Sequence, residues 1–270
     1  MYKAHWDGKK EYEKFWAGRK SYPCSTRNDK KPHRRKGLWI VGFCVLFFCV
    51  LAVALYPSEQ AVQPDEPQGM IGDAFEEIPD FCGEDYIVLN NNIPYFSVDD
   101  YALTPMEHYS DLDDLGRCGP AFAVLHRSLM PTEEREGIGM IKPSGWHQNK
   151  YEGIVDSNPP YLYNRCHLIA FALAGENANE KNLITGTRYF NESSMLPFEK
   201  NVMKYLDTSD NHVLYRVTPY FKENELVARG VEIEAYSVED NGEGVCFNVF
   251  IYNYQPGIYI DYLTGENRAQ

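Results

Sequence analysis

Several features that mark common classes of protein are missing from this sequence. None of its seven cysteines has the C-x-x-C spacing of structural zinc sites, so such a site is not expected. No segment repeats at a fixed period, which excludes a solenoid. Basic residues are scarce beyond residue 37, where 14 Lys and Arg stand against 35 Asp and Glu. Such an acidic body is not expected to attract nucleic acid through its overall charge.

The first 37 residues have the opposite charge, with 12 Lys and Arg against 4 Asp and Glu. They lead into Leu38–Tyr56, 19 residues without a charged side chain. As a helix this run would cover about 28 Å, close to the hydrocarbon thickness of a bilayer. The basic triplet Arg34-Arg35-Lys36 directly before it predicts a cytoplasmic N-terminus. The sequence therefore predicts a single-pass protein of the cell membrane whose acidic body lies outside the cell.

Two alternatives to an uncleaved signal-anchor were weighed. A buried helix of a soluble core normally keeps a polar stripe, which this apolar run lacks. Ala52-Val53-Ala54 resembles a signal-peptide cleavage site, but the segment before the run is long and the run exceeds a usual signal core. The uncleaved anchor is favoured, and cleavage stays an alternative.

Composition divides the chain into four segments. Residues 57–79 are rich in Pro, Gln, Glu and Asp, and they contain too few apolar residues to bury a core. We therefore expect a basic cytoplasmic segment, a transmembrane signal-anchor, a flexible acidic linker and an extracellular domain, at residues 1–37, 38–56, 57–79 and 80–270.

Four cysteines fall in the predicted extracellular domain, where disulfides can form: Cys82, Cys118, Cys166 and Cys246. Their spacing leaves three pairings open. We expect at least one disulfide and slightly prefer Cys82–Cys118, because both residues lie early in the domain. Four buried free thiols are the alternative.

Hydrophobic patterning predicts short strands and two helices in this domain. The strands are expected at Tyr86–Leu89, Ala121–Leu125, Tyr161–Tyr163, Val213–Val217, Leu226–Ala235 and Val245–Tyr252. The helices are expected at Leu168–Leu173, closed by Gly175, and at Glu192–Leu206. In the second helix, Pro197 fits the first turn, and one face carries Phe198, Val202, Tyr205 and Leu206. Strands in runs, with helices segregated from them, predict an α+β fold with an antiparallel sheet core.

Residues suited to phosphodiester hydrolysis follow one another in the second half of the chain. His167, at a strand end, can act as a general base because an unperturbed imidazole titrates near pH 6.5. Asn191 offers a neutral oxygen ligand, which suits a Mg²⁺ ion that keeps most of its waters. Glu199 lies about two helical turns further on and can hold those waters. Arg165 and Arg188 supply positive charge for phosphate oxygens.

Each of these residues also has a more ordinary interpretation, since a single His is often structural and Asn often caps a helix. Their order nevertheless resembles a known family. Asn164-Arg165-Cys166-His167, followed by Phe190-Asn191 and Glu199, resembles the DNA/RNA non-specific endonuclease family with its ββα-metal motif. The chain looks most like the secreted and membrane-anchored nucleases of streptococci and related Gram-positive bacteria. The likeness continues through Gly116–Gly119, Leu129–Thr132, Lys142–Trp146, Arg165–Ile169, Gly175–Asn179 and Asn182–Thr185.

The resemblance implies a magnesium-dependent, sequence-non-specific endonuclease that hydrolyses DNA, with RNA as a second substrate, and leaves 5′-phosphate ends. Mn²⁺ is the expected substitute for Mg²⁺. His167 would be the general base, Asn191 the direct metal ligand and Glu199 the holder of metal-bound water. Arg165 would join the catalytic group, and support of the site or of the phosphate would come from Asn164, Asn182 and Arg188.

Two positions depart from the Asp-Arg-Gly-His of the wider family. Asn164 replaces an Asp and removes a carboxylate, although the streptococcal branch also has Asn there. Cys166 replaces a Gly beside the base, where a disulfide would stiffen the strand and a free thiol could be oxidised. A surface DNA receptor with an impaired centre is therefore the main alternative function. An adhesive membrane protein is a weaker one, because it leaves the ordered motif unexplained.

The acidic body conflicts with a nucleic-acid substrate unless cations gather at the site. Five basic residues lie in the motif region, and we expect them to surround the cleft: Arg165, Lys181, Arg188, Lys200 and Lys204. Weak, metal-assisted binding is the alternative. The sequence predicts DNA, RNA and a membrane as partners, and no protein partner can be inferred from it.

Overall fold

The computed structural model describes residues 78–270 except 82 and 102. The predicted cytoplasmic segment and membrane anchor lie outside the described residues. Within the described part, no helix is long and apolar enough to cross a bilayer.

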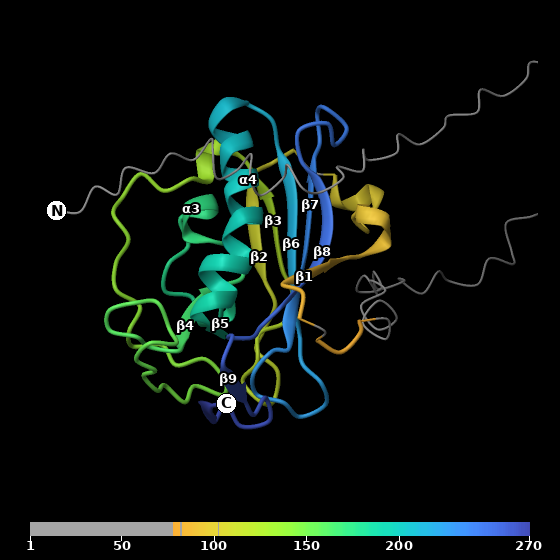
Figure 1. Cartoon of the computed structure of the whole chain (residues 1–270). Helices are drawn as coiled ribbons and strands as arrows, with labels where there is room; N and C mark the ends of the chain where they lie inside the picture. The colour runs from red at the N-terminus through yellow and green to blue at the C-terminus, as the bar shows by residue number, and fades with distance from the viewer. Residues whose placement is uncertain (1–77, 82, 102) are drawn as a thin grey trace, which may run out of the picture. The chain divides into compact units, whose positions relative to one another are not determined.

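A six-stranded antiparallel sheet forms the centre of the described fold (Figure 1). Its strands, in spatial order, are β1 (Tyr86–Val88), β8 (Cys246–Tyr252), β7 (Gly230–Ser237), β6 (Val213–Tyr220), β3 (Ala121–Leu125) and β2 (Met106–Tyr109). The three longest strands, β6, β7 and β8, follow one another in the chain and pair as neighbours. This sheet confirms the antiparallel core that was predicted for an α+β fold.

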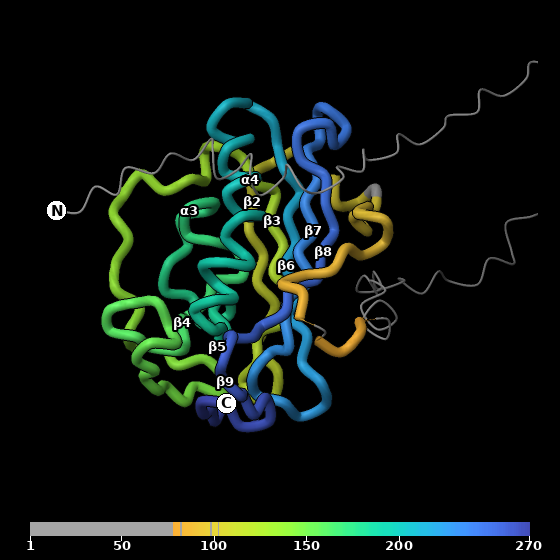
Figure 2. The backbone as a smooth tube through the Cα atoms, in the orientation of Figure 1, coloured from red at the N-terminus to blue at the C-terminus, as the bar shows by residue number. Residues whose placement is uncertain are grey.

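Helix α4 (Leu196–Thr208) covers one face of this sheet, on the side where α3 also lies (Figures 1 and 2). Its buried face contains Phe198, Val202 and Leu206, as the helical spacing predicts. The Phe198 ring packs 5.3 Å from that of Phe247 in β8, measured between ring centroids. Burying a side chain of this size contributes about 1.5–3 kcal/mol, so this face holds the helix on the sheet.

A second, smaller unit of strands lies next to this helix. Strands β4 (Tyr163–His167) and β5 (Leu183–Thr187) form an antiparallel pair in which His167 lies opposite Leu183. Between them come α3 (Phe171–Ala174) and a 3₁₀ turn, η5 (Glu180–Asn182). A π-helix, η6 (Phe190–Met195), follows β5 and continues into α4. The chain thus makes the strand–strand–helix order of a ββα motif.

The remaining elements are short. Three further 3₁₀ turns are η2 (Asn90–Asn92), η3 (Val98–Asp100) and η4 (Arg127–Leu129). The chain ends in a hairpin of β9 (Ile258–Ile260) and β10 (Asn267–Ala269). The Tyr163 hydroxyl donates a hydrogen bond of 2.9 Å to the Gly265 carbonyl, which ties this hairpin to β4.

Several predicted elements have different limits in the structure. The strand expected at Tyr161–Tyr163 lies at Tyr163–His167, and the helix expected from Glu192 begins at Leu196, after the π-helix. The helix expected at Leu168–Leu173 begins only at Phe171, because Asn182 holds the two residues after β4 in bends through the bonds Leu168 N–Asn182 O and Ile169 N–Asn182 Oδ1. The strand expected from Leu226 begins at Gly230, because the amides of Leu226 and Val227 donate to the Tyr262 carbonyl instead of joining the sheet.

The cysteines confirm one expectation and overturn another. Cys246 is disulfide-bonded, as predicted for at least one cysteine of this domain. Cys118 and Cys166 are free and buried, so the preferred pairing of Cys82 with Cys118 is wrong. The Cys118 thiol instead lies 3.2 Å from the Leu183 carbonyl and 3.3 Å from that of Glu180. Burial raises the pKa of this thiol to about 12, which keeps it protonated as a donor to these oxygens.

Candidate active site

His167 lies at the end of β4 and is buried. Its Nε2 atom is 2.8 Å from the carbonyl oxygen of Asn177. Because a carbonyl oxygen can only accept, Nε2 must carry the hydrogen, and Nδ1 is left with its lone pair. One backbone contact therefore selects the tautomer and leaves Nδ1 as the basic atom.

Burial lowers the pKa of His167 to about 4, and the positive charge of Arg135 acts in the same direction. The hydrogen bond to Asn177 opposes this shift. The imidazole is therefore neutral near pH 7. A neutral ring with a fixed tautomer is the form in which a histidine can accept a proton from water.

Arg135 is a site residue that the sequence analysis missed. Its Nη2 atom is 3.3 Å from Nδ1 of His167, and its Nε donates to Oδ1 of Asn177 over 3.4 Å. Its charge also lowers the pKa of Glu199, so it influences two of the predicted catalytic groups. In the sequence it lies 32 residues before His167 within Glu133-Glu134-Arg135-Glu136, a pattern typical of a solvated surface segment. The one available signal was its position just after Leu129–Thr132, a stretch shared with the resembled family.

Asn191, the predicted metal ligand, is part of the π-helix rather than of a regular α-helix. Short π-helical insertions often occur at functional sites. The Asn191 Oδ1 atom lies 3.0 Å from the sulfur of Cys166, whose thiol donates to it. Burial raises the pKa of Cys166 well above its ordinary value, so this thiol keeps its proton.

Cys166 fits at this position because its diagonal neighbour on β5, Gly186, has no side chain. A Cβ atom at Gly186 would lie 2.3 Å from the Cys166 sulfur, far inside van der Waals contact. The departure of this chain from the Gly of the wider family is thus matched by a glycine on the neighbouring strand. Since Cys166 is a free thiol, a stiffening disulfide at this position is excluded.

Glu199 projects from α4 and is only 8% exposed. Burial raises the pKa of its carboxyl to about 7, while the charges of Arg135 and Lys200 partly oppose the shift. Its carboxylate receives no hydrogen bond from any residue that the structure describes. A buried carboxylate without partners is costly, and a cation or its water shell would supply the missing partners.

These donors suit a magnesium ion. Mg²⁺ prefers oxygen ligands and is usually held by one or two protein groups while it keeps several waters. The Asn191 Oδ1 atom has a second lone pair after accepting from Cys166, and Glu199 offers an unpaired carboxylate. Asn191 and Glu199 are therefore the residues that would hold such an ion.

Arg165 contacts a loop rather than an open cleft. Its Nη2 atom donates to the Gly139 carbonyl over 2.8 Å, and its Nε donates to the carbonyl of Ile141. Its guanidinium carbon also lies 4.3 Å from the ring centre of Trp146. These contacts make Arg165 an anchor for the segment that leads to Trp146.

Three other predicted residues have mainly structural contacts. Asn182 is buried, and its side chain exchanges two hydrogen bonds of 2.8 and 3.0 Å with the backbone of Ile169, which shape the exit from β4. Asn164 donates to the Glu192 carboxylate over 3.5 Å. Arg188 forms an ion pair with that same carboxylate. Asn164 and Arg188 therefore meet at Glu192 in the π-helix.

Three of the five basic residues that were expected around the cleft are bound to other groups of the protein. Lys181 pairs with Asp111 over 2.6 Å, Arg188 pairs with Glu192, and Arg165 binds the loop carbonyls. The cation that lies next to the predicted base is Arg135.

Residues 97–239 match the family described as DNA/RNA non-specific endonuclease. The chain belongs to this family. It is therefore a nuclease.

Solved structures agree with this assignment. NucA from Streptococcus agalactiae with a magnesium ion bound is 28% identical, with a TM-score of 0.62, over 73% of this chain and 94% of that chain. Its form with no metal bound is 29% identical, with a TM-score of 0.61, over 73% and 92%. The Sda1 nuclease with a bound zinc ion is 24% identical, with a TM-score of 0.57 over 69% and 96%, and shows likeness of fold.

Proposed function

We propose that this nuclease is a magnesium-dependent, sequence-non-specific endonuclease of the cell surface. It hydrolyses DNA, with RNA as a second substrate, and leaves 5′-phosphate ends. The observation that carries the proposal is the state of His167, a neutral imidazole whose Nε2 is held by a backbone carbonyl. Its Nδ1 accepts from Arg135 Nη2 over 3.3 Å, and Asn191 and Glu199 belong to η6 and α4, which follow the pair of strands β4 and β5.

In this mechanism Arg135 turns its Nη2 from Nδ1 of His167 to the phosphate, and the freed lone pair of Nδ1 takes the proton of the attacking water. Arg135 lies beside that atom, where its charge can stabilise the negative charge that develops on the phosphate. Cleavage of the bond between phosphorus and the 3′ oxygen leaves the phosphate on the 5′ end of the product.

Asn191 would supply an oxygen ligand for Mg²⁺, and Glu199 would hold water of the ion. When bound, the ion polarises the phosphate and neutralises developing charge. The presence of magnesium in the related NucA structure supports this choice of metal, and Mn²⁺ is the expected substitute.

The surface location is supported by the charge pattern around Leu38–Tyr56, which predicts a single span with the N-terminus in the cytoplasm. The disulfide at Cys246 agrees with it, because stable disulfides form in oxidising compartments. External protease on intact cells should therefore digest the nuclease domain and spare the N-terminus. Digestion of the N-terminus alone would refute this orientation.

The activity is tested with the full-length protein in mild detergent, incubated with plasmid DNA or RNA and with Mg²⁺, Mn²⁺ or chelator. Cleavage that needs a divalent ion, with product ends that accept a kinase label only after dephosphorylation, supports the proposal. Cleavage in chelator would overturn the metal dependence. Tight DNA binding without cleavage would favour the receptor alternative.

A further inference from the structure

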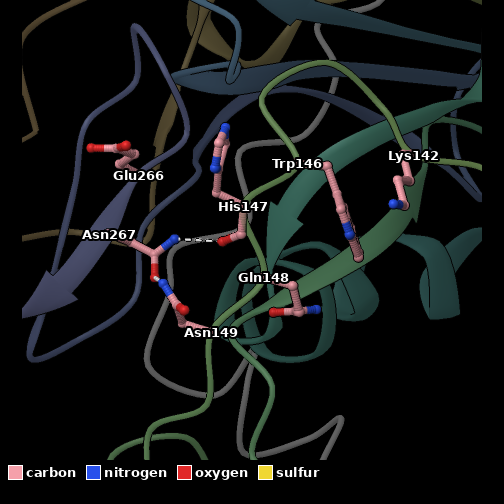
Figure 3. Close-up of a pocket in the computed structure, with 7 residues that line it drawn as sticks. All are labelled: Lys142, Trp146, His147, Gln148, Asn149, Glu266 and Asn267. Atoms are coloured by element: carbon pink, nitrogen blue, oxygen red, sulfur yellow. Dashed lines mark hydrogen bonds between the residues drawn. The ribbon is translucent and has the colours of Figure 1, made fainter.

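An open pocket of about 520 Å³ lies away from His167 and contains none of the predicted site residues. One wall is the segment between Lys142 and Asn149, and the other is the C-terminal hairpin with Glu266 and Asn267. In Figure 3, Glu266 lies at one end of the pocket and Lys142 at the other, with His147 and Trp146 between them.

The wall with Trp146 belongs to residues 135–148, which run alongside β4 from its C-terminal end to its N-terminal end. Arg135 contacts His167, the Ile141 carbonyl accepts from Arg165, and the Gln148 side chain exchanges two hydrogen bonds with the backbone of Tyr163. At about 3.3 Å per residue, the four steps from His167 to Tyr163 cover about 13 Å. A strand of about four stacked nucleotides has this length, so the pocket lies within reach of nucleotides next to the scissile phosphate.

This segment is held rigidly. The Ser144 hydroxyl donates to the Leu226 carbonyl over 2.7 Å, and the Thr185 hydroxyl of β5 donates to the Ser144 carbonyl over 2.8 Å. Gly145 has a φ of +66°, and a Cβ there would lie 2.5 Å from Val227. The Arg165 guanidinium covers the Trp146 ring. A wall fixed in this way can bind a ligand without a further cost of ordering.

The pocket combines a cation, an aromatic ring and a carboxylate. The ammonium of Lys142, the imidazole of His147 and the carboxylate of Glu266 make no hydrogen bond or ion pair with any described residue. Lysine binds phosphate as a point charge, and bases stack on tryptophan irrespective of their sequence. A glutamate accepts hydrogen bonds from the amino groups of bases, as it does from cytosine N4. Lys142, Trp146 and Glu266 thus match the phosphate, the base face and the base edge of one nucleotide.

We propose that this pocket is a subsite for an unpaired nucleotide of the substrate strand, a few nucleotides from the cleaved bond. Lys142 binds its phosphate, Trp146 contacts its base, and Glu266 accepts from the base edge. A base inside a duplex cannot stack on Trp146, because its faces are covered by its neighbours, so single-stranded nucleic acid is the substrate that uses the whole site. This inference rests on the proposed nuclease function and adds a substrate preference to it.

The first test compares Lys142→Glu with Lys150→Glu in the full-length protein. Lys150 is a matched control because it is exposed on the same segment but lies over the Tyr161 ring and does not line the pocket. With a single-stranded decamer, Lys142→Glu should raise KM about tenfold at unchanged kcat. It should also lower the slope of log KM against log salt by about 1, as expected for one lost phosphate contact. A dinucleotide cannot span the distance, so its cleavage should not change.

The outcomes separate the two proposals. If the unmodified protein cleaves neither substrate, the nuclease proposal fails. If it cleaves both and the two lysine variants behave alike, the nuclease proposal stands and the subsite is wrong. An equal loss with the decamer and the dinucleotide would also overturn the subsite, because it would indicate a general effect of charge.

The second test measures binding without turnover, using His167→Ala in chelator. Binding of oligothymidine should quench tryptophan fluorescence, and the quenching should be lost when Trp146→Phe is added. The three other tryptophans, Trp6, Trp16 and Trp39, remain as an internal reference. Equal quenching with and without Trp146, or stronger quenching by a blunt duplex than by the single strand, would overturn the assignment.

Discussion

Two buried glutamates in different regions of this molecule have the same altered acidity. Glu199 lies on α4 beside the candidate active site, and Glu232 lies in β7 of the large sheet. They are 8% and 5% exposed, and burial raises the pKa of each to about 7. A shifted carboxyl is therefore not by itself a sign of function in this protein.

The neighbours of the two residues differ in charge. Glu199 is near the cations Arg135 and Lys200, which favour its ionised form. Glu232 is near Glu234, which disfavours ionisation, although Arg216 and Asn248 oppose that effect. Its Oε1 atom is buried without a hydrogen-bond partner among the described residues. Both charged neighbours of Glu199 are cations, which suits a carboxylate that acts near a phosphate, whereas Glu232 also faces the carboxylate of Glu234.

Replacing His167 by alanine is the strongest test of whether catalysis takes place next to strands β4 and β5. Turnover should fall by about 10²–10⁴-fold, which is what loss of a general base typically costs. Folding and DNA binding should change little, and added imidazole should restore part of the rate. The measurements are kcat, circular dichroism and DNA affinity. Recovery of activity with metal but not with imidazole would show that His167 is not the base.

Asn191→Ala should produce the next largest loss. It removes the proposed direct ligand, so activity at low Mg²⁺ should fall and raised Mg²⁺ should recover part of it. A titration of rate against Mg²⁺ concentration checks this, with calorimetric Mg²⁺ binding as an independent measure. A variant that is indifferent to Mg²⁺ concentration would refute the role of Asn191.

The two glutamates then form a matched pair for activity. Glu199→Gln should lower kcat about 10–100-fold, the usual cost of losing a group that holds a ligand or its water. Glu232→Gln should leave kcat within about twofold, since no catalytic contact involves it. Equal losses in the two variants would mean that both act through the stability of the fold, and that the contrast between the two regions is wrong.

The regions of the molecule also differ in how far the sequence predicts them. The face of Phe198, Val202 and Leu206 and five of the six strands of the large sheet follow from hydrophobic periodicity, which is a local property. Strand β5 was missed because all five of its residues are buried, so it shows no alternation. Edge strand β2 was missed because Met106-Glu107-His108-Tyr109 has too little apolar character to stand out.

In the site, the ordered motif predicts His167, Asn191 and Glu199 as functional residues. Arg135 could not be found in this way, because its contact with His167 depends on the path of a charged segment in space. The π-helix escaped prediction because a single extra residue in a helical turn leaves no clear pattern. The cysteine pairing failed because the direction of a thiol, here that of Cys118 toward two carbonyls, is a tertiary property.

The smallest expected effect concerns stability and distinguishes the two glutamates once more. The folded pKa near 7 lies above the ordinary value of 4.5, so between these values the folded protein holds protons that the unfolded chain has lost. The free energy of unfolding should therefore fall as pH rises from about 4.5 to 7. In chelator at pH 8, both Glu→Gln variants should be more stable than the unmodified protein by on the order of 1–3 kcal/mol, and at pH 4.5 by much less.

Magnesium should change the stability of the two variants differently. An ion at the active site favours the ionised form of Glu199 and removes most of the cost of burying its charge, whereas Glu232 has no such partner. In saturating Mg²⁺ at pH 8, Glu199→Gln should therefore lose its stabilising effect while Glu232→Gln keeps it. Denaturant unfolding of the two variants with Mg²⁺ and with chelator measures the difference. If Mg²⁺ leaves the stability advantage of Glu199→Gln unchanged, Glu199 does not hold the ion or its waters, whatever its effect on kcat.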